Sequence, residues 1–295
     1  MEKNLLFLTI KQYGQLVFFL KIIICFTILF FVMRFTISAP FPYCIILQFF
    51  LGALYFHMKE LQHEALHEAT QWKILNRILG FILGTPMLVS YSDYQYYHKL
   101  HHIYVGTDKN TEYFTYNNQK NLRVWSLIID LFMLKHYEKI IRKIFKCLLF
   151  NHMEIREISI RRRIKQEYIA FILIILSVIL VSGFYQSLLA IKLWVIPLIF
   201  FTLPINFLLE MPEHIFCENS HKNIFHNTRT IKSNWLMTWF VNGNNYHVEH
   251  HYNPNYPISF LSHLHNEVKN QILYFDKSYA SFYKNFFKKI RGCSR

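Results

Sequence analysis

Charged residues are scarce in this chain of 295 residues. Asp, Glu, Lys and Arg make up 17% of it, against roughly 25% in an average soluble domain. Hydrophobic residues account for 53%. So little charge beside so much apolar surface is typical of a protein that sits in lipid.

Cysteine is also sparse, and its spacing excludes the usual frameworks. No two cysteines form a C-x-x-C pair, so neither a disulfide scaffold nor a thiolate cluster is indicated. The five are Cys25, Cys44, Cys147, Cys217 and Cys293. The chain also lacks an internal repeat, a low-complexity linker and a second soluble domain, which predicts one membrane-bound domain over residues 1–295.

Four apolar stretches are long enough to cross a bilayer as helices, which takes about 20 residues each. They cover about residues 16–33, 37–56, 168–184 and 194–209. The first is read as a retained span rather than a cleaved signal, and Lys21, its one charge, is expected to snorkel to the membrane boundary. Short loops join the stretches in pairs. We therefore expect an all-α integral membrane fold with four transmembrane helices arranged as two hairpins.

Lys and Arg are unevenly distributed along the chain. Of the 32, 17 lie between residues 57 and 167 and ten follow residue 209, whereas the two hairpin loops carry only Arg34 and Lys192. The positive-inside rule then assigns residues 57–167 and 210–295 to the cytoplasm, as a helical cap on the membrane. No nucleic-acid motif accompanies the net charge of +14, so no nucleic-acid partner is expected.

Two further segments are predicted to lie at the membrane surface. Much of the positive charge lies between residues 135 and 165, in a stretch such as K-H-Y-E-K-I-I-R-K-I-F-K. Its apolar residues recur at helical spacing and predict an amphipathic helix on anionic headgroups. Residues 74–89 are apolar but interrupted, which predicts a surface-lying or re-entrant helix.

Histidine is abundant, with 16 residues, and half of them fall in three short boxes. The first box is H-E-A-L-H, and the second and third both have the pattern H-x-x-H-H. The spacings i, i+3 and i+4 put the imidazoles of a box on one helical face, where they can reach a common ion. The eight residues are His63, His67, His98, His101, His102, His247, His250 and His251.

Eight imidazoles exceed the three or four that one zinc ion takes, so two metal ions are the natural number. His214, in the segment E-M-P-E-H after the fourth apolar stretch, is a ninth candidate ligand. Glu64, Glu213, Glu249 and Asn245, with Asn244 beside it, are predicted to orient the ligating rings from outside. The other histidines have no repeated spacing and are not expected to be ligands: His57, His136, His152, His221, His226, His263 and His265.

In their order and spacing, the three boxes resemble the membrane-bound fatty acid desaturase superfamily. The resemblance extends to the pair Glu213 and His214, to N-T-R-T over residues 227–230, and to N-N-Y-H-V-E-H-H-Y-N-P-N-Y-P over residues 244–257. One position departs from the pattern: acyl-CoA desaturases have an Asn four residues before the additional histidine, and here that position is Glu210.

The resemblance implies a non-haem di-iron centre on the cytoplasmic side, with the eight box histidines and His214 as ligands. Such a centre uses O2 to oxidise an unactivated C–H bond of a lipid, here by introducing a double bond in a fatty acyl chain. The chain shows no haem domain, flavin fingerprint or cysteine cluster, so a separate ferredoxin or cytochrome must supply the electrons.

Three alternatives remain open from the sequence. A lipid or carotenoid hydroxylase or ketolase of the same superfamily has similar boxes. An intramembrane zinc metalloprotease would use the H-E-x-x-H pattern of His63, Glu64 and His67, with Glu64 activating water. A histidine-rich metal transporter would use the boxes as carriers, although transporters place their ligands within the spans.

Overall fold

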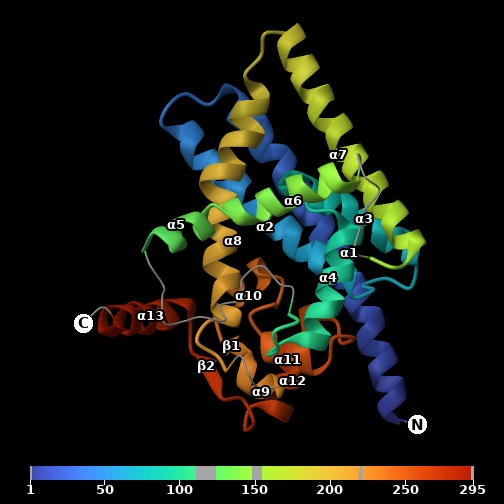
Figure 1. Ribbon diagram of the computed structural model, residues 1–295, viewed down its shortest axis with the longest axis vertical. Coiled ribbons are helices and arrows are strands. Elements are labelled where there is room, and N and C mark those ends of the chain that lie inside the picture. Colours follow the sequence, from blue (N-terminus) through green and yellow to red (C-terminus); the bar gives the residue numbers. More distant parts are fainter. Residues whose placement is uncertain (1, 111–123, 148–154, 219–221, 294–295) are drawn as a thin grey trace.

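The computed structural model describes residues 2–110, 124–147, 155–218 and 222–293, and it is built almost entirely of helices (Figure 1). The longer helices are α1 (Glu2–Ser38), α2 (Tyr43–Leu66), α3 (Lys73–Gly84), α4 (Tyr91–Tyr104), α5 (Val124–Leu131), α6 (Leu134–Phe145), α7 (Ile158–Phe184), α8 (Leu203–Glu210) and α13 (Tyr279–Cys293). The shorter elements are α9 (Ile224–Asn227), α10 (Trp235–Phe240), α11 (His247–Tyr252), α12 (Leu261–Val268), β1 (Arg229–Ile231) and β2 (Tyr274–Asp276). Single 3-10 turns are η1 (Thr85–Met87), η6 (Met211–Glu213) and η7 (Ile258–Phe260).

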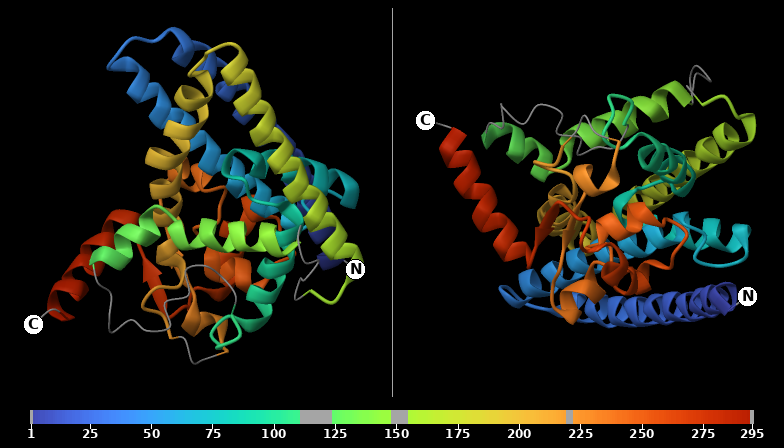
Figure 2. Two further views of the ribbon diagram at one scale, coloured as in Figure 1. Left: turned by 45° about the horizontal axis from the view of Figure 1, so that its top comes forward. Right: turned by 90° about the horizontal axis from the view of Figure 1, so that it is seen from below.

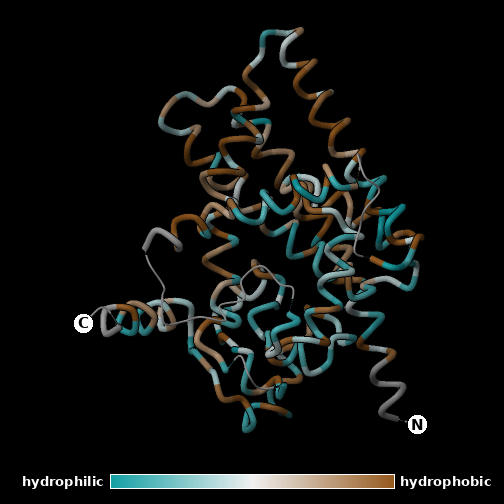
Figure 3. The backbone as a smooth tube through the Cα atoms, in the orientation of Figure 1, coloured by the Kyte–Doolittle hydropathy of each residue, from teal (hydrophilic) through white to brown (hydrophobic). Residues whose placement is uncertain are grey.

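Four helical segments are long and apolar enough to cross a membrane, as predicted. They are Leu8–Ser38, Tyr43–Leu66, Ile158–Phe184 and Ile191–Glu213. Each extends beyond one or both ends of the apolar stretch that predicted it, because helix continues into the flanking residues. The second begins at Tyr43 rather than at residue 37, because residues 37 and 38 belong to the first helix. Figure 3 shows apolar residues along these helices and hydrophilic residues gathered at the other end of the molecule.

The fourth span is irregular. Two π-helical segments, η4 (Ile191–Val195) and η5 (Pro197–Thr202), precede α8. Proline lacks the N–H group that an α-helix requires, and Pro197 stands at the start of the second π-helical segment. A local change in hydrogen-bond register at such positions is a common accommodation of proline in spanning helices.

The first two spans pack along each other and against the fourth. Phe18 and Cys25 of α1 are fully buried in the same core as Leu51 and Leu61 of α2. The backbone of the fourth span approaches α2 closely at Gly52, whose carbonyl oxygen accepts a hydrogen bond of 3.0 Å from Thr202 Oγ1. Close approach of this kind depends on a small residue at the contact.

Lys21 does not snorkel to the boundary as expected. It is 7% exposed, and its Nζ donates to Asn242 Oδ1 at 2.7 Å and to Ser259 Oγ at 3.0 Å. A buried ammonium needs hydrogen-bond partners, and the C-terminal segment supplies them. Lys21 therefore ties α1 to the segment that carries the third histidine box.

Shorter helices lie across the ends of the spans. The segments Lys73–Met87 and Tyr91–Tyr104 meet at 96°, which fits the predicted re-entrant or surface-lying element. In Figures 1 and 2, α5 and α6 cross the molecule on the side opposite α1.

Helix α6 is amphipathic, as predicted. Its exposed apolar residues, Leu134, Ile141 and Phe145, share one helical face. Most of its Lys and Arg residues are exposed as well, but Lys143 Nζ lies 2.8 Å from Asp93 Oδ2. The helix ends at Phe145, and α7 begins at Ile158.

The C-terminal segment adds the one departure from an all-α fold among the described residues. Strands β1 and β2 pair in parallel, with Thr230 opposite Phe275. An isolated bridge joins Thr230 to Tyr246, directly before the third histidine box. This small sheet therefore fixes the entry to α11.

Candidate metal centre

The three histidine boxes come from different elements and meet in the interior. His63 lies in the last turn of α2, and His67 caps its C-terminus. The second box lies on α4 and the third on α11, while His214 follows η6. These elements bring eight of the nine predicted ligands into two groups of four. The first group is His63, His67, His98 and His250, and the second is His101, His214, His247 and His251.

Within each group the ring nitrogens converge at the spacing of ligands around one ion. Nε2 of His98 lies 2.7 Å from Nε2 of His63 and 2.9 Å from Nε2 of His67. In the second group, Nε2 of His247 lies 3.1 Å from that of His214 and 3.2 Å from that of His251. Metal–nitrogen bonds of about 2.1 Å at right angles separate two ligand atoms by about 3 Å, which matches these contacts.

The ninth histidine, His102, lies at the boundary of the two groups. Its Nε2 is 3.0 Å from Nε2 of His98 in the first group, and its ring centre is 4.4 Å from that of His251 in the second. The structure therefore brings all nine predicted ligands together.

In several rings Nδ1, the nitrogen that points away from the group, donates to an oxygen acceptor. Nε2 of the same ring then faces the centre of the group. His101 Nδ1 donates to Asn110 Oδ1 at 2.9 Å, and His214 Nδ1 donates to the Asn227 carbonyl oxygen at 3.0 Å. His247 Nδ1 donates to Asn244 Oδ1 at 3.2 Å. A neutral imidazole has one N–H, so donation from Nδ1 leaves a lone pair on Nε2 for a metal.

His250 gives the clearest test of whether a metal fits. It is fully buried, and neither ring nitrogen has a hydrogen-bond partner. A buried polar atom without a partner is costly, and a ligand bond to an ion in the first group would satisfy one of the two nitrogens. Burial, and next the positive charge that His67 and His102 would carry, hold the pKa of His250 well below its ordinary value. The ring is therefore neutral at pH 7, as a metal ligand must be.

A cavity of about 510 Å³ reaches both groups. It touches His63 and His98 of the first group and His214 and His247 of the second. Tyr94, Tyr97 and Tyr168 contribute aromatic surface to its wall, and α6 contributes His136, Lys139, Ile140, Arg142 and Lys143. The cavity thus gives a substrate access to the proposed metal positions.

Comparison with known families agrees with this geometry. A family model described as fatty acid desaturase matches residues 38–283, which is most of the chain. The chain belongs to the fatty acid desaturase family. A comparison with curated proteins gave no match. Membership in the desaturase family makes the protein an oxidoreductase of the kind that oxidises lipids, and its histidine groups fit a metal site.

Glu213 and Glu249 were both predicted to orient ligands of this desaturase-family site, but their contacts differ. Glu213 Oε2 lies 3.3 Å from His247 Nε2, the inward nitrogen, and its Oε1 accepts from Asn244 at 2.9 Å. Glu249 instead contacts Thr230 Oγ1 at 2.6 Å and His265 Nδ1 at 2.5 Å. Glu213 therefore stands beside the second histidine group, whereas Glu249 binds residues outside both groups.

Glu64 and Asn245 also contact groups other than the box histidines. Glu64 Oε2 accepts from Asn242 Nδ2 at 2.8 Å, and Asn245 Nδ2 donates to the Ile231 carbonyl oxygen at 2.8 Å. It is Asn244, the neighbour of Asn245, that binds a ligating ring. Of these two neighbouring residues, only Asn244 orients a ligating ring. Sequence spacing alone cannot tell which of the two does so.

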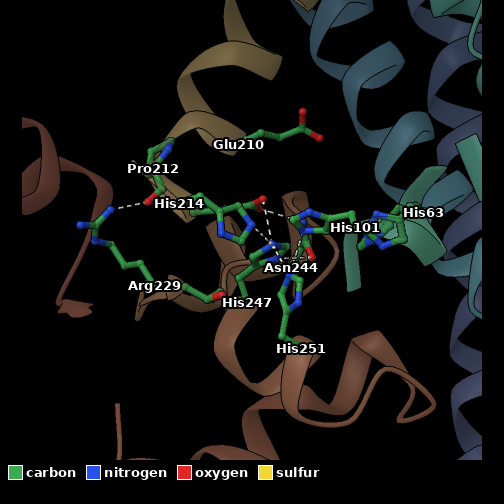
Figure 4. Close-up of polar contacts among 12 residues, drawn as sticks. His63, His101, Glu210, Pro212, His214, Arg229, Asn244, His247 and His251 are labelled. Carbon is green, nitrogen blue, oxygen red and sulfur yellow. Dashed lines mark hydrogen bonds and ion pairs between the residues drawn. The ribbon is translucent and has the colours of Figure 1, made fainter. Parts of the chain in front are cut away.

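Two contributing residues were missed in the sequence. Asn110 follows the second box by eight residues and has no motif to mark it. Arg229 lies in N-T-R-T, and its guanidinium donates to the carbonyl oxygens of Pro212 and Ile215, on either side of His214 (Figure 4). Arg229 thereby fixes the loop that presents His214, supported by an ion pair of 3.2 Å with Asp276.

The histidines that were not expected to be ligands lie outside both groups where they are described. His57 Nδ1 contacts the Phe240 carbonyl oxygen at 2.7 Å, and His226 Nδ1 contacts Glu218 Oε2 at 3.1 Å. His136 lines the cavity, and His263 meets Phe260 edge to face. His152 and His221 lie outside the described residues.

Proposed function

We propose that this protein uses O2 to oxidise an unactivated C–H bond of a lipid at a centre of two iron ions. The reaction we favour is the introduction of a double bond into a fatty acyl chain. The observation that carries the proposal is the pair of histidine groups, four rings each, side by side in the interior. One group suffices for a single ion, so two groups support a two-ion site.

In this proposal His63, His67, His98 and His250 hold one iron, and His101, His214, His247 and His251 hold the other. His102 adds a ligand between them. The two irons, when bound, supply the oxidising power that no side chain has. The protein's own residues fix the ring tautomers through Asn110, Asn244 and the Asn227 carbonyl oxygen, and keep the rings buried and neutral.

The cavity holds the substrate beside both groups in this proposal. Tyr94, Tyr97 and Tyr168 offer the aromatic surface against which a hydrocarbon chain packs. We further propose that the four spans form two hairpins in a bacterial inner membrane, with the site on the cytoplasmic side and a single domain over residues 1–295. A separate ferredoxin or cytochrome delivers the electrons, and the basic cytoplasmic face attracts an acidic carrier.

The test is substitution of His250 by Ala. We expect His250→Ala to abolish turnover and to lower bound iron below two ions per chain, because a buried ligand is lost. Iron is measured by mass spectrometry on purified protein and turnover by lipid analysis with O2 and reductant. His226→Ala, at a histidine outside both groups, is the control and should retain iron and activity. Full turnover by His250→Ala with its iron retained would contradict the proposal.

The same lipid analysis separates the alternatives. A desaturase yields a product two hydrogens lighter than the substrate, whereas a hydroxylase or ketolase adds oxygen. The protease alternative needs Glu64 to activate water, yet Glu64 is engaged by Asn242, and one zinc ion would have to replace two irons. Turnover that continued without O2 would refute an oxygen-dependent reaction of either kind.

A further inference from the structure

A buried ion pair stands next to both histidine groups. Lys59 on α2 contacts Glu210 at the end of α8, and the two side chains are 8% and 15% exposed. Each lies one helical turn before a proposed ligand: Lys59 precedes His63 by four residues, and Glu210 precedes His214 by four. The pair therefore links the helices that present the first and second groups.

Neighbouring side chains hold the pair in place. Asn206 Nδ2 donates to Glu210 Oε2 at 2.8 Å, and Glu60 Oε1 lies 3.4 Å from Lys59 Nζ. Lys59 Nζ also lies 5.4 Å from the centre of the Tyr94 ring. Figure 4 shows Glu210 extending over the group that contains His214. The carboxylate is thus fixed beside the second histidine group.

Stability alone does not account for this arrangement. Two charges taken out of water lose more solvation than their attraction commonly returns, and an apolar pair of similar volume is usually as stable. Here the pair replaces apolar packing at the end of two spanning helices. A chemical role is the better explanation for charged groups at this depth.

The pair also lines the cavity that reaches the histidines. Lys59 and Glu210 share its wall with His136 and Lys139 of α6, and Lys139 is exposed to solvent. Burial, and then the positive charges of Lys143 and Lys59, lower the pKa of His136 to about 3, so Lys59 acts electrostatically across the cavity. A cavity with polar groups on several sides holds water readily. The cavity wall therefore has the exposed Lys139 as well as the buried Lys59 and Glu210, and water in the cavity can connect them.

We propose that Lys59 and Glu210 deliver the protons that the oxidation consumes. This inference rests on the proposed function. Desaturation follows –CH2–CH2– + O2 + 2 e⁻ + 2 H⁺ → –CH=CH– + 2 H2O, with the electrons from the separate carrier. Hydroxylation, R–H + O2 + 2 e⁻ + 2 H⁺ → R–OH + H2O, needs the same two protons. Each proton that Lys59 Nζ releases ends in a product water. Glu210 passes a replacement proton to Lys59, which cavity water relays from the solvent, so both side chains return to their starting charges.

The first experiment replaces the carboxylate without changing its shape. We expect Glu210→Gln to lower kcat by on the order of 100-fold, since positioned proton transfer contributes about that much. Iron content should stay at the wild-type value, while the solvent isotope effect on kcat and the release of peroxide should rise. The thermal unfolding midpoint should fall, because Lys59 loses its charged partner. Glu210→Asp, which keeps a carboxylate, should retain most of the turnover. Lys59→Arg keeps the positive charge, but its guanidinium does not release a proton, so its kcat should fall as in Glu210→Gln.

Two results would overturn the inference. Wild-type kcat and isotope effect in Glu210→Gln would show that the carboxylate carries no proton. Loss of iron in step with loss of turnover would show that the pair only supports the fold. Neither result touches the proposed function, which fails instead if wild-type protein oxidises no lipid or if His250→Ala retains iron and turnover.

A second experiment needs no metal. In metal-free protein, Lys59→Cys should react with a charged, water-soluble methanethiosulfonate at least about 10-fold faster than Leu61→Cys, because Lys59 lines the cavity and Leu61 is 0% exposed. Wild-type protein gives the background from its own cysteines. Equal, slow labelling of both variants would mean that water does not reach the pair, and the relay would be wrong.

Discussion

At the residue scale, the geometry of the site depends on which acceptor binds Nδ1 of each histidine ring. Asn244 and Asn245 are adjacent and both buried, yet only Asn244 contacts an imidazole, at His247 Nδ1. Asn245 binds the backbone at Ile231 instead. Asn244 therefore orients the His247 ring, whereas Asn245 supports the fold.

Substitution of these two residues gives a matched prediction. Asn244→Ala should lower metal affinity roughly 10- to 100-fold, because His247 loses the acceptor that fixes its tautomer. Asn245→Ala should lower the unfolding midpoint with little change in metal affinity. Equilibrium dialysis against buffered Fe²⁺ measures the affinity, and thermal unfolding in detergent measures the stability. Equal affinity losses in both variants would contradict this assignment of roles.

At the element scale, helix packing depends on a few close approaches. A Cβ added at Gly52 would collide with Phe201 Cβ and lie 2.9 Å from the Pro197 carbonyl oxygen. At Gly183, near the end of α7, nothing lies within 4 Å of an added Cβ. A Gly-to-Ala substitution thus meets closely packed atoms at Gly52 in α2 and open space at Gly183 in α7.

Gly52→Ala should therefore destabilise the protein by about 1–3 kcal/mol, as overpacking of a tight contact does. Gly183→Ala should be neutral or stabilising by up to about 1 kcal/mol, because Ala favours helix more than Gly does. Thermal or denaturant unfolding in the same detergent compares the two. A Gly52→Ala variant as stable as Gly183→Ala would show that α2 and the fourth span do not pack so closely.

The elements also show how far a sequence can be read. The four apolar stretches predicted the spanning helices, and the spacing within the boxes predicted eight rings that converge. His214 was predicted from its place after the fourth stretch. The contact of Lys143 with Asp93 and the burial of Lys21 beside Asn242 were not predictable. These partners are 50 and 221 residues apart in sequence, and the local pattern of a single sequence carries no trace of such pairings.

At the scale of the whole molecule, buried neutral histidines couple stability to pH. Burial lowers the pKa of His136 to about 3 and holds that of His251 well below its ordinary value of about 6.5. The unfolded chain binds protons on these rings from about pH 6.5 downward, whereas the folded chain does not. Their contribution to stability is therefore complete above about pH 6.5 and is lost progressively as the pH falls toward 3.

The unfolding midpoint of the metal-free protein should accordingly drop between pH 7.5 and pH 5. His136→Gln should make this dependence shallower, and His226→Gln, at a histidine outside both groups, should leave it unchanged. Differential scanning fluorimetry across that pH range measures both variants. An unfolding midpoint that rose on acidification would contradict the sign of these pKa shifts.

The distribution of the ligands along the chain also bears on biogenesis. His63 emerges from the ribosome long before His251, and each group of four draws on residues separated by more than 100 positions. A nascent chain that has inserted only its first two helices has at most five of the nine rings. Loading of the proposed centre would then have to wait until α11 is synthesised and folded, so metal would enter a nearly finished protein rather than guide its assembly.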